Sequence, residues 1–154
     1  MNVVVLTESM PEVEEIRKLF LEYEKSLDID LCFQDFEKEL ENLPGEYAAP
    51  SGRLILAFED DAIAGCVALR KLSDGACEMK RLYVKPEFRG AGIGRRLAEA
   101  VLREARTIGY TKMYLDTLAS MKEAGGLYQS LGFEETEPYR YNPCEDCRFM
   151  ALVL

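Results

Sequence analysis

Apolar residues along this chain follow two patterns, short continuous runs and runs that repeat every three or four positions. Continuous runs bounded by turn residues are typical of buried strands, and the wider repeat is typical of helices with one apolar face. We predict strands at residues 3–6, 53–58, 63–69, 76–84, 111–115, 133–134 and 148–154. We predict helices from an N-cap at Thr7 or Ser9 to Leu27, and at residues 31–40, 92–108 and 121–131.

The two N-terminal helices precede residues 43–52, whose prolines and glycines interrupt regular structure. Phe33, Phe36 and Leu40 share one face of the second helix. Such a helix pair either covers a core or forms a wall of a substrate site. The sequence leaves both alternatives open.

Turns link three of the predicted strands in succession. The acidic turn at residues 59–61 predicts an antiparallel hairpin, and residues 73–75 predict a second turn before the strand at 76–84. Helix, strand, helix and two strands follow. This order predicts a mixed α/β sheet.

Length and composition place limits on the organisation of the chain. The 154 residues, 48% of them hydrophobic, fit one globular domain over residues 1–154. No run approaches the roughly 18 apolar residues of a membrane span, and the N-terminus lacks the order of a secretory signal. We therefore expect a cytoplasmic protein without a membrane partner. The net charge of −9 disfavours nucleic acid as a partner.

The cysteines and the absence of histidine limit which disulfides, metal sites and proton-transfer groups the chain can form. Five scattered cysteines argue for reduced thiols, not a disulfide framework. Cys144 and Cys147 form a C-x-x-C pair, which supplies half a zinc site at most and is expected to be a loop before the last strand. We predict no metal site. Without histidine, proton transfer must use Glu, Asp, Tyr, Lys, Cys or water.

A glycine-rich loop at residues 89–96 joins a predicted strand to a predicted helix. Gly90, Gly92 and Gly94 allow backbone amides to approach a ligand, and a helix N-terminus adds unpaired donors. Arg89 and Arg95 supply charge-assisted hydrogen bonds to phosphate. The loop is therefore interpreted as a pyrophosphate site, with a simple tight turn as the alternative.

The surrounding charge favours the phosphate interpretation. Residues 80–103 carry seven bases and two acids, a net charge of +5, so the rest of the chain carries −14. A solvated helix face accounts for some of these bases. Their concentration around the glycines is better explained by an anionic ligand.

The strand from Glu78 to Val84 is followed by the pattern Arg89-x-x-Gly92-x-Gly94 and later by the pattern Leu127-Tyr128-x-x-x-Gly132-Phe133. These three motifs together resemble the GNAT superfamily of N-acetyltransferases. The resemblance implies a mostly antiparallel sheet of about seven strands flanked by about four helices. It also implies transfer of an acetyl group from acetyl-CoA to a primary amine of a small molecule or peptide, by direct attack in a ternary complex.

The resemblance implies a set of residues that contact the co-substrate. In this family, the end of the fourth strand binds the pantetheine arm as an added strand, and that strand splays from the next one. The next loop holds the pyrophosphate. The implied residues are Leu82, Tyr83, Val84, Arg89, Gly90, Ala91, Gly92, Ile93, Gly94 and Arg95. Met121 stands where many members have an asparagine that contacts the cofactor, and Thr117 or Lys122 is a candidate replacement.

Two residues are implied for catalysis. Tyr128 matches a tyrosine that protonates the departing thiolate, with a core role as the alternative. Glu78 lies eleven residues before Arg89, where some members place a glutamate general base. In an extended strand Glu78, Lys80, Leu82 and Val84 share one face, so a Glu78–Lys80 ion pair is the alternative.

The acceptor site is expected near the end of the strand at 111–115 and in the loop before the last strand. Asp116 is a candidate to bind the acceptor amine or to cap the next helix. Tyr139 and Tyr141 are candidates to close over the acceptor or to pack on the sheet. The acceptor's identity stays open, as does a homodimer, which is common in this superfamily.

Two other functions compete with catalysis. A dinucleotide-binding fold fits poorly, because the third glycine comes one position early and three strands precede it. A non-catalytic acyl-CoA sensor would keep the glycine loop and lose the proton-transfer groups. Retention of Glu78 and Tyr128 favours an enzyme.

Overall fold

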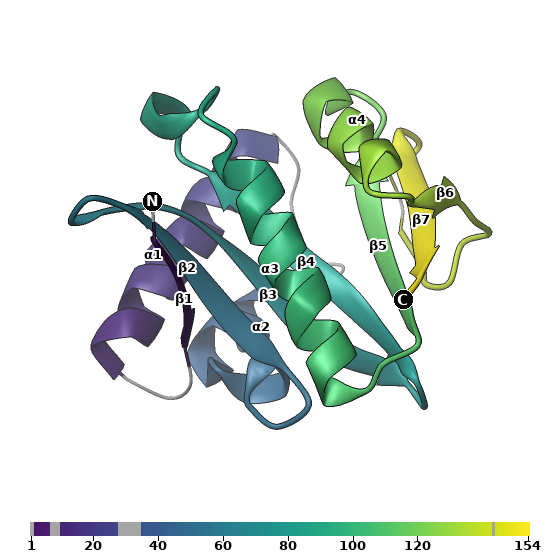
Figure 1. Ribbon diagram of the computed structural model, residues 1–154, viewed down its shortest axis with the longest axis horizontal. Helices are drawn as coiled ribbons and strands as arrows, with labels where there is room; N and C mark the ends of the chain where they lie inside the picture. Colours follow the sequence, from purple (N-terminus) through teal and green to yellow (C-terminus); the bar gives the residue numbers. More distant parts are fainter. Residues whose placement is uncertain (1, 7–9, 28–34, 143) are drawn as a thin grey trace.

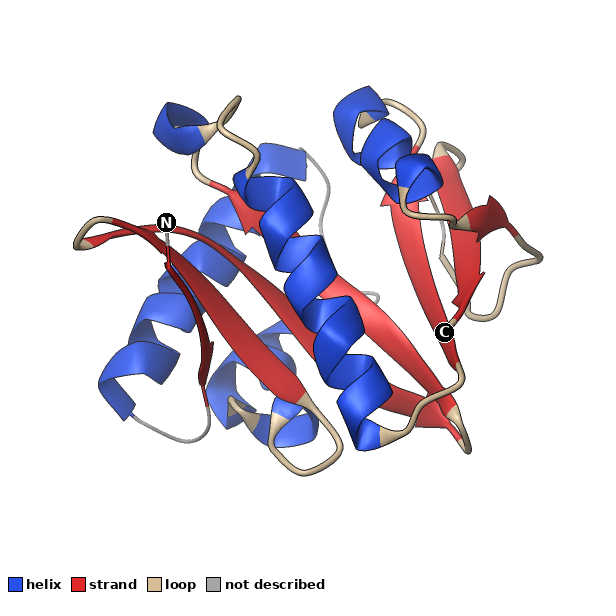
Figure 2. Ribbon diagram, viewed as in Figure 1, coloured by secondary structure: helices blue, strands red, loops and turns tan. Residues whose placement is uncertain are grey.

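The computed structural model describes residues 2–6, 10–27, 35–142 and 144–154 (Figures 1 and 2). The strands are β1 (Asn2–Leu6), β2 (Arg53–Glu59), β3 (Ala62–Ser73), β4 (Ala76–Val84), β5 (Lys112–Leu118), β6 (Glu134–Glu135) and β7 (Cys147–Val153). The α-helices are α1 (Met10–Leu27), α2 (Phe36–Asn42), α3 (Ile93–Ile108) and α4 (Lys122–Ser130). Single 3₁₀ turns occur at Gly45–Tyr47 and Pro86–Phe88.

The described strands form one sheet in the order β1-β2-β3-β4-β5-β7-β6. Strands β4 and β5 are parallel, and the other described neighbours are antiparallel. Four described α-helices flank the sheet. The predicted fold class, a mixed and mostly antiparallel sheet with helices on both faces, is confirmed.

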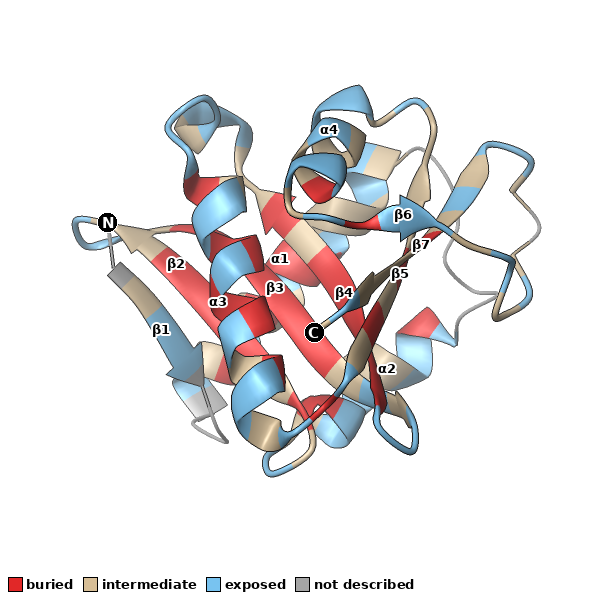
Figure 3. Cartoon of the chain, turned by 45° about the vertical axis from the view of Figure 1, so that its right-hand side comes forward, coloured by how far each residue is buried: buried red, intermediate tan, exposed pale blue. Residues whose placement is uncertain are grey.

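The helices cover the two faces of the sheet in pairs. In Figure 1, α3 crosses in front of β2, β3 and β4, while α1 and α2 lie behind them. Helix α3 shares one apolar core with β2–β5 and α4, and α1 and α2 share a second core with β2–β4. The sheet therefore separates two cores, and the buried stripe of α3 faces the sheet in Figure 3.

The ends of α3 follow from its flanking glycines. Gly92 and Gly109 adopt φ angles of 81° and 110°, values that favour glycine. The amide of Gly109 donates to the Ala105 carbonyl, as a C-terminal cap does. Between these glycines, Leu97 and Val101 are fully buried against the sheet. The predicted helix and its Gly109 cap are confirmed.

Strands β4 and β5 separate soon after they meet. Their described pairing joins residues 76–78 of β4 to residues 112–114 of β5. Beyond that, β5 continues to Leu118 along β7, which explains why it is longer than the predicted 111–115. Figure 1 shows the two strands diverging toward the N-terminal end of α3. The second half of β4 therefore has a strand edge that faces away from β3 and is not paired with β5 within the described residues.

A β-bulge corrects the predicted face assignment of β4. Ala68 pairs with Lys80 and Cys66 pairs with Tyr83, so two residues along β3 oppose three along β4. Arg81, at the bulge, has a φ of 60°. The extra residue reverses the alternation, so Leu82 and Val84 pack with the α3 core while Glu78 and Lys80 lie opposite Met79. The expectation that all four residues share one face is wrong.

Other differences lie in the N-terminal region. Helix α2 begins at Phe36, after Asp35 with a φ of 55°, and continues to Asn42 instead of ending at residue 40. The predicted start at residue 31, with Phe33, lies outside the described residues. Among the helices described, none combines the length and the apolar character that a membrane span needs.

Candidate active site

A cleft of about 620 Å³ lies where β4 and β5 diverge. Its walls are the last residues of β4, the loop and first turn of α3, the end of β5 with the start of α4, and Tyr23 and Ser26 of α1. Ligand clefts in proteins commonly have volumes of roughly 300–1,000 Å³. The cleft is thus large enough for a small-molecule ligand.

The glycine loop forms one end of this cleft. Gly90 and Gly92 line it with φ angles of 88° and 81°, and an added Cβ at either position would meet no described atom within 4 Å. Their requirement for glycine is therefore conformational, not steric. In a helix that begins at Ile93, the amides of Ile93, Gly94 and Arg95 have no acceptor inside the helix. This turn can donate to an anion.

Most of the predicted co-substrate residues meet at the cleft. Eight of the eleven line it, namely Leu82, Tyr83, Val84, Arg89, Gly90, Gly92, Ile93 and Gly94. Ala91 and Arg95 are not among its lining residues, and Arg95 donates to Ser130 Oγ of α4 at 2.6 Å. Thr117 lines a separate, smaller cavity instead.

Arg89 lies against the end of β4. Its Nε donates to the Val84 carbonyl oxygen at 3.0 Å, and its guanidinium carbon lies 5.8 Å from the centroid of the Tyr83 ring. These contacts hold a positive charge at the rim of the cleft, beside the glycine loop.

A small cavity of about 20 Å³ lies beside the cleft and shares Tyr23, Leu82 and Met121 with it. Because β4 and β5 have separated here, side chains from both faces of the sheet meet in the gap. Lys80 and Asp116 come from the face of α1 and α2, and Tyr128 comes from α4 on the opposite face. The cavity thus joins three groups able to exchange or attract protons.

Tyr128 lies on the buried side of α4. It is 6% exposed, and its ring meets the edge of Phe133 at a centroid distance of 5.8 Å. Burial raises the pKa of the Tyr128 phenol. Its hydroxyl is therefore protonated over the range in which enzymes work, as a proton donor must be.

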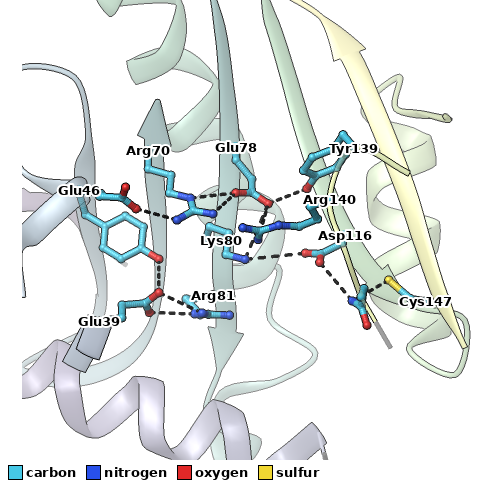
Figure 4. A network of polar contacts seen from close by, with 12 residues as sticks. Glu39, Glu46, Arg70, Glu78, Lys80, Arg81, Asp116, Tyr139, Arg140 and Cys147 are labelled. Atoms are coloured by element: carbon cyan, nitrogen blue, oxygen red, sulfur yellow. Dashed lines mark hydrogen bonds and ion pairs between the residues drawn. The ribbon is translucent and has the colours of Figure 1, made fainter. Parts of the chain in front are cut away.

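Glu78 is fully buried and surrounded by donors (Figure 4). Its carboxylate accepts hydrogen bonds from Arg70 Nε at 2.9 Å, Arg140 Nη1 at 3.1 Å and the Tyr139 hydroxyl at 2.6 Å. Lys80 Nζ lies 3.7 Å away. Burial raises the pKa of Glu78, but the charges of Lys80, Arg70 and Arg140 outweigh it, so the net shift is downward. This geometry fits the ion-pair alternative better than a proton acceptor.

Asp116 belongs to the same polar group. It lies inside β5, with Asn142 Nδ2 3.3 Å from its Oδ2 and Lys80 Nζ 4.0 Å from its Oδ1. Helix α4 begins at Lys122 without a side-chain cap, so the alternative that Asp116 caps this helix is wrong. Its side chain is 10% exposed at the small cavity.

The two candidate tyrosines lie in different surroundings. Tyr139 packs between the rings of Tyr114 and Phe149, with centroid distances of 5.1 and 5.4 Å, while its hydroxyl bonds Glu78. Tyr141 is 75% exposed and lines neither the cleft nor the small cavity. Tyr139 therefore packs on the sheet and holds Glu78, and the structure does not bring Tyr141 to the site.

The C-x-x-C pair forms part of a turn that contacts the site. Cys147 N donates to the Cys144 carbonyl at 3.2 Å, and Asn142 Nδ2 lies 3.0 Å from Cys147 Sγ. Both cysteines are free thiols. The predicted loop before the last strand is confirmed over its described residues up to Asp146, with Pro143 outside them, whereas Cys147 is the first residue of β7.

The structure places two further residues in the site, Tyr23 and Lys80. Tyr23 of α1 lines both the cleft and the small cavity, and its ring centroid lies 6.2 Å from that of Tyr83. The sequence indicates Lys80 only as an ion-pair partner of Glu78. A lysine within a strand of mainly apolar residues was the available signal for Lys80, whereas the apolar helical spacing of Tyr23 gave none beyond core packing.

Comparisons with known proteins agree with this geometry. Residues 13–133 match the acetyltransferase (GNAT) family, and the chain belongs to this family. An uncharacterized N-acetyltransferase of Schizosaccharomyces pombe is 37% identical over 99% of this chain and 96% of its own. One from Dictyostelium discoideum is 33% identical over 99% of each chain.

Among solved structures, the PaiA N-acetyltransferase of Thermoplasma acidophilum, in complex with coenzyme A, superposes with a TM-score of 0.74. The match covers the whole of both chains at 16% identity. At this identity the likeness supports the fold.

Proposed function

We propose that this protein transfers an acetyl group from acetyl-CoA to a primary amine of a small molecule or peptide, by direct attack in a ternary complex. The observation that carries the proposal is the gap between β4 and β5. The cleft in this gap is lined by the first turn of α3, and the small cavity beside it is lined by Lys80, Asp116 and Tyr128.

The cleft fits the two chemically distinct parts of acetyl-CoA. The amides of the first turn of α3, with Arg89 nearby, suit a pyrophosphate. The edge of β4 at residues 82–84, which lines the cleft and has no β5 partner among the described residues, suits the amides of the pantetheine arm, which would add to it as an extended strand. This orientation directs the thioester toward Tyr128.

Tyr128 would act as the acid that protonates the departing thiolate. The attacking amine forms the C–N bond, the C–S bond breaks, and the sulfur takes the proton of the Tyr128 hydroxyl. Protonation makes departure of the thiol irreversible on the timescale of the step. Asp116 would attract the acceptor as an ammonium ion, since its carboxylate lies at the cavity that Tyr128 also lines.

A panel of amines tests the activity. Release of CoA thiol from acetyl-CoA would be followed with spermidine, kanamycin, glutamate and a tripeptide with a free N-terminus. The proposal expects turnover with at least one of them. Saturable binding of CoA without turnover of any amine would instead support the acyl-CoA sensor.

The role of Tyr128 has its own test. Tyr128→Phe should lower kcat about 10- to 100-fold, because one proton donor is lost, and should change acetyl-CoA affinity by less than about twofold. Tyr110→Phe is the matched control, since it removes a hydroxyl that bonds the Ser51 carbonyl away from the cleft. Equal kcat in the Tyr128 and Tyr110 variants would remove the acid assignment.

A further inference from the structure

Lys80 is a buried amine within the candidate active site, and the mechanism above gives it no role. Its side chain is 2% exposed, and its Nζ lies 3.7 Å from Glu78 Oε2 and 4.0 Å from Asp116 Oδ1. Figure 4 shows the amine pointing across the gap from β4 toward β5. A lysine on a strand beside a substrate cleft has one common alternative role, a purely structural ion pair.

The position of Lys80 suits contact with the reacting groups. It lines the small cavity together with Tyr128 and Asp116, and this cavity meets the cleft at Tyr23, Leu82 and Met121. If the acceptor ammonium is drawn to Asp116, its proton comes within reach of the Lys80 amine. The proposed acid, Tyr128, lies in the same cavity.

The surroundings of Lys80 determine its protonation. Burial and the charge of Arg81 lower the pKa of Lys80, the carboxylates of Glu78 and Asp116 raise it, and Arg140 lowers it. The net result is a pKa lowered from 10.5 to about 7. Other titratable or charged groups on the described elements around it include Tyr23 of α1, Glu39 of α2, Arg70 of β3, Tyr128 of α4, Tyr139 before β7 and Cys147 of β7. At neutral pH the amine is therefore present in both forms.

The competing bases at the site are weaker candidates. Glu78 is held by Arg70, Arg140 and Tyr139, and its pKa is lowered, so it binds a proton poorly at neutral pH. Tyr128 is protonated and is the proposed acid. Arg70, Arg81 and Arg140 do not deprotonate.

Resting on the proposed function, we propose that Lys80 is the general base of the reaction. Its neutral amine takes one proton from the acceptor ammonium, and the freed amine attacks the thioester carbonyl. The C–S bond then breaks and the thiolate takes the Tyr128 proton. The second proton of the attacking nitrogen returns to Tyr128, Lys80 releases its proton to solvent, and each turnover yields one amide, one thiol and one proton.

The test is the dependence of kcat on pH, measured with the amine of the panel that turns over fastest. For the wild type, kcat should rise to a plateau with an apparent pKa near 7. Lys80→Arg keeps the positive charge but cannot give up its proton. Its kcat at pH 7 should fall about 100-fold or more and then rise about tenfold per pH unit as hydroxide replaces the base.

Lys112→Arg is the matched control, because Lys112 lies on β5 with its amine over the Tyr114 ring. It lines neither the cleft nor the small cavity. It should keep the wild-type profile. A Lys80→Arg variant that keeps the plateau, or that loses the same factor at every pH, would overturn the proposal. Both variants should retain their circular dichroism and their calorimetric affinity for CoA.

A second measurement covers the case in which the Lys80 variants do not fold. In wild-type protein labelled with ¹³C-lysine, one side-chain signal should titrate near pH 7. Absence of such a signal would exclude Lys80 as the base. Failure of the wild type to release CoA with any amine would instead contradict the proposed function.

Discussion

The two faces of β4 differ in chemical character, one being apolar and the other charged. On one face, Cys77 and Met79 belong to the apolar core under α3. On the other, Glu78 and Lys80 belong to a buried network of charges that extends to Asp116 and Arg140. The difference teaches that one strand can both anchor the core and carry the site, because its alternation separates the two tasks.

The bulge at Arg81 makes this division possible. Arg81 forms a bidentate ion pair with Glu39 of α2 and lies over the Phe36 ring, with its guanidinium carbon 5.1 Å from the centroid. Past the bulge, Leu82 and Val84 pack with the α3 core, while the strand edge remains open toward the cleft. The bulge thus turns Leu82 and Val84, which line the cleft, toward the α3 core.

The largest expected effect comes from removing the centre of the charged face. Glu78→Ala leaves Arg70, Arg140 and Lys80 without their shared carboxylate, and should lower the free energy of unfolding by about 3–5 kcal/mol. Urea denaturation measures it. Glu46→Ala is the matched control, since Glu46 also pairs with Arg70 but is 74% exposed, and should cost under about 1 kcal/mol. Equal losses in the two variants would contradict the importance of burial.

Substitutions on the apolar face of β4 should lower the free energy of unfolding slightly less than Glu78→Ala does. Met79→Ala removes a core side chain that is 3% exposed and should lower the free energy of unfolding by about 2–5 kcal/mol. Met79→Leu keeps the volume and should cost less than about 1.5 kcal/mol. Met79 also lines the small cavity, so the pH profile of kcat is compared in Met79→Leu, which keeps the volume and should leave the profile unchanged. A shift in that profile would show that the two faces are not independent.

Lys80 should make the stability of the protein depend on pH. Its pKa is lowered from 10.5 to about 7 on folding, so between these values the unfolded chain binds more protons. The free energy of unfolding should therefore rise with pH in this window, by up to about 1.4 kcal/mol per unit. Measured against Lys80→Met, which cannot titrate, the wild type should gain stability from pH 7 to 9. An unchanged difference would contradict the lowered pKa.

The smallest expected effect compares two glycines at the ends of α3. Gly92→Ala and Gly109→Ala each force alanine into a left-handed conformation, at a cost of about 1–2 kcal/mol. Gly92 lines the cleft and Gly109 does not. Only Gly92→Ala should also raise the KM for acetyl-CoA. A similar KM for acetyl-CoA in both variants would contradict the proposal that the glycine loop binds the co-substrate.

The sequence predicted the elements well and the side-chain arrangement only in part. Strand β4 and helix α3 follow from local patterns, and β4 has the predicted bounds, Ala76–Val84. The bulge could not be predicted, because no proline or glycine marks Arg81 and its conformation depends on pairing with β3 and on Glu39. The cavity shared by Lys80, Asp116 and Tyr128 could not be predicted either, because it depends on where β4 and β5 separate.

The central claim is that the gap between β4 and β5 binds the pyrophosphate and pantetheine of coenzyme A. Isothermal titration calorimetry of the folded protein with CoA tests it most directly. The account predicts saturable binding of one CoA per chain. Absence of heat up to millimolar CoA would contradict it.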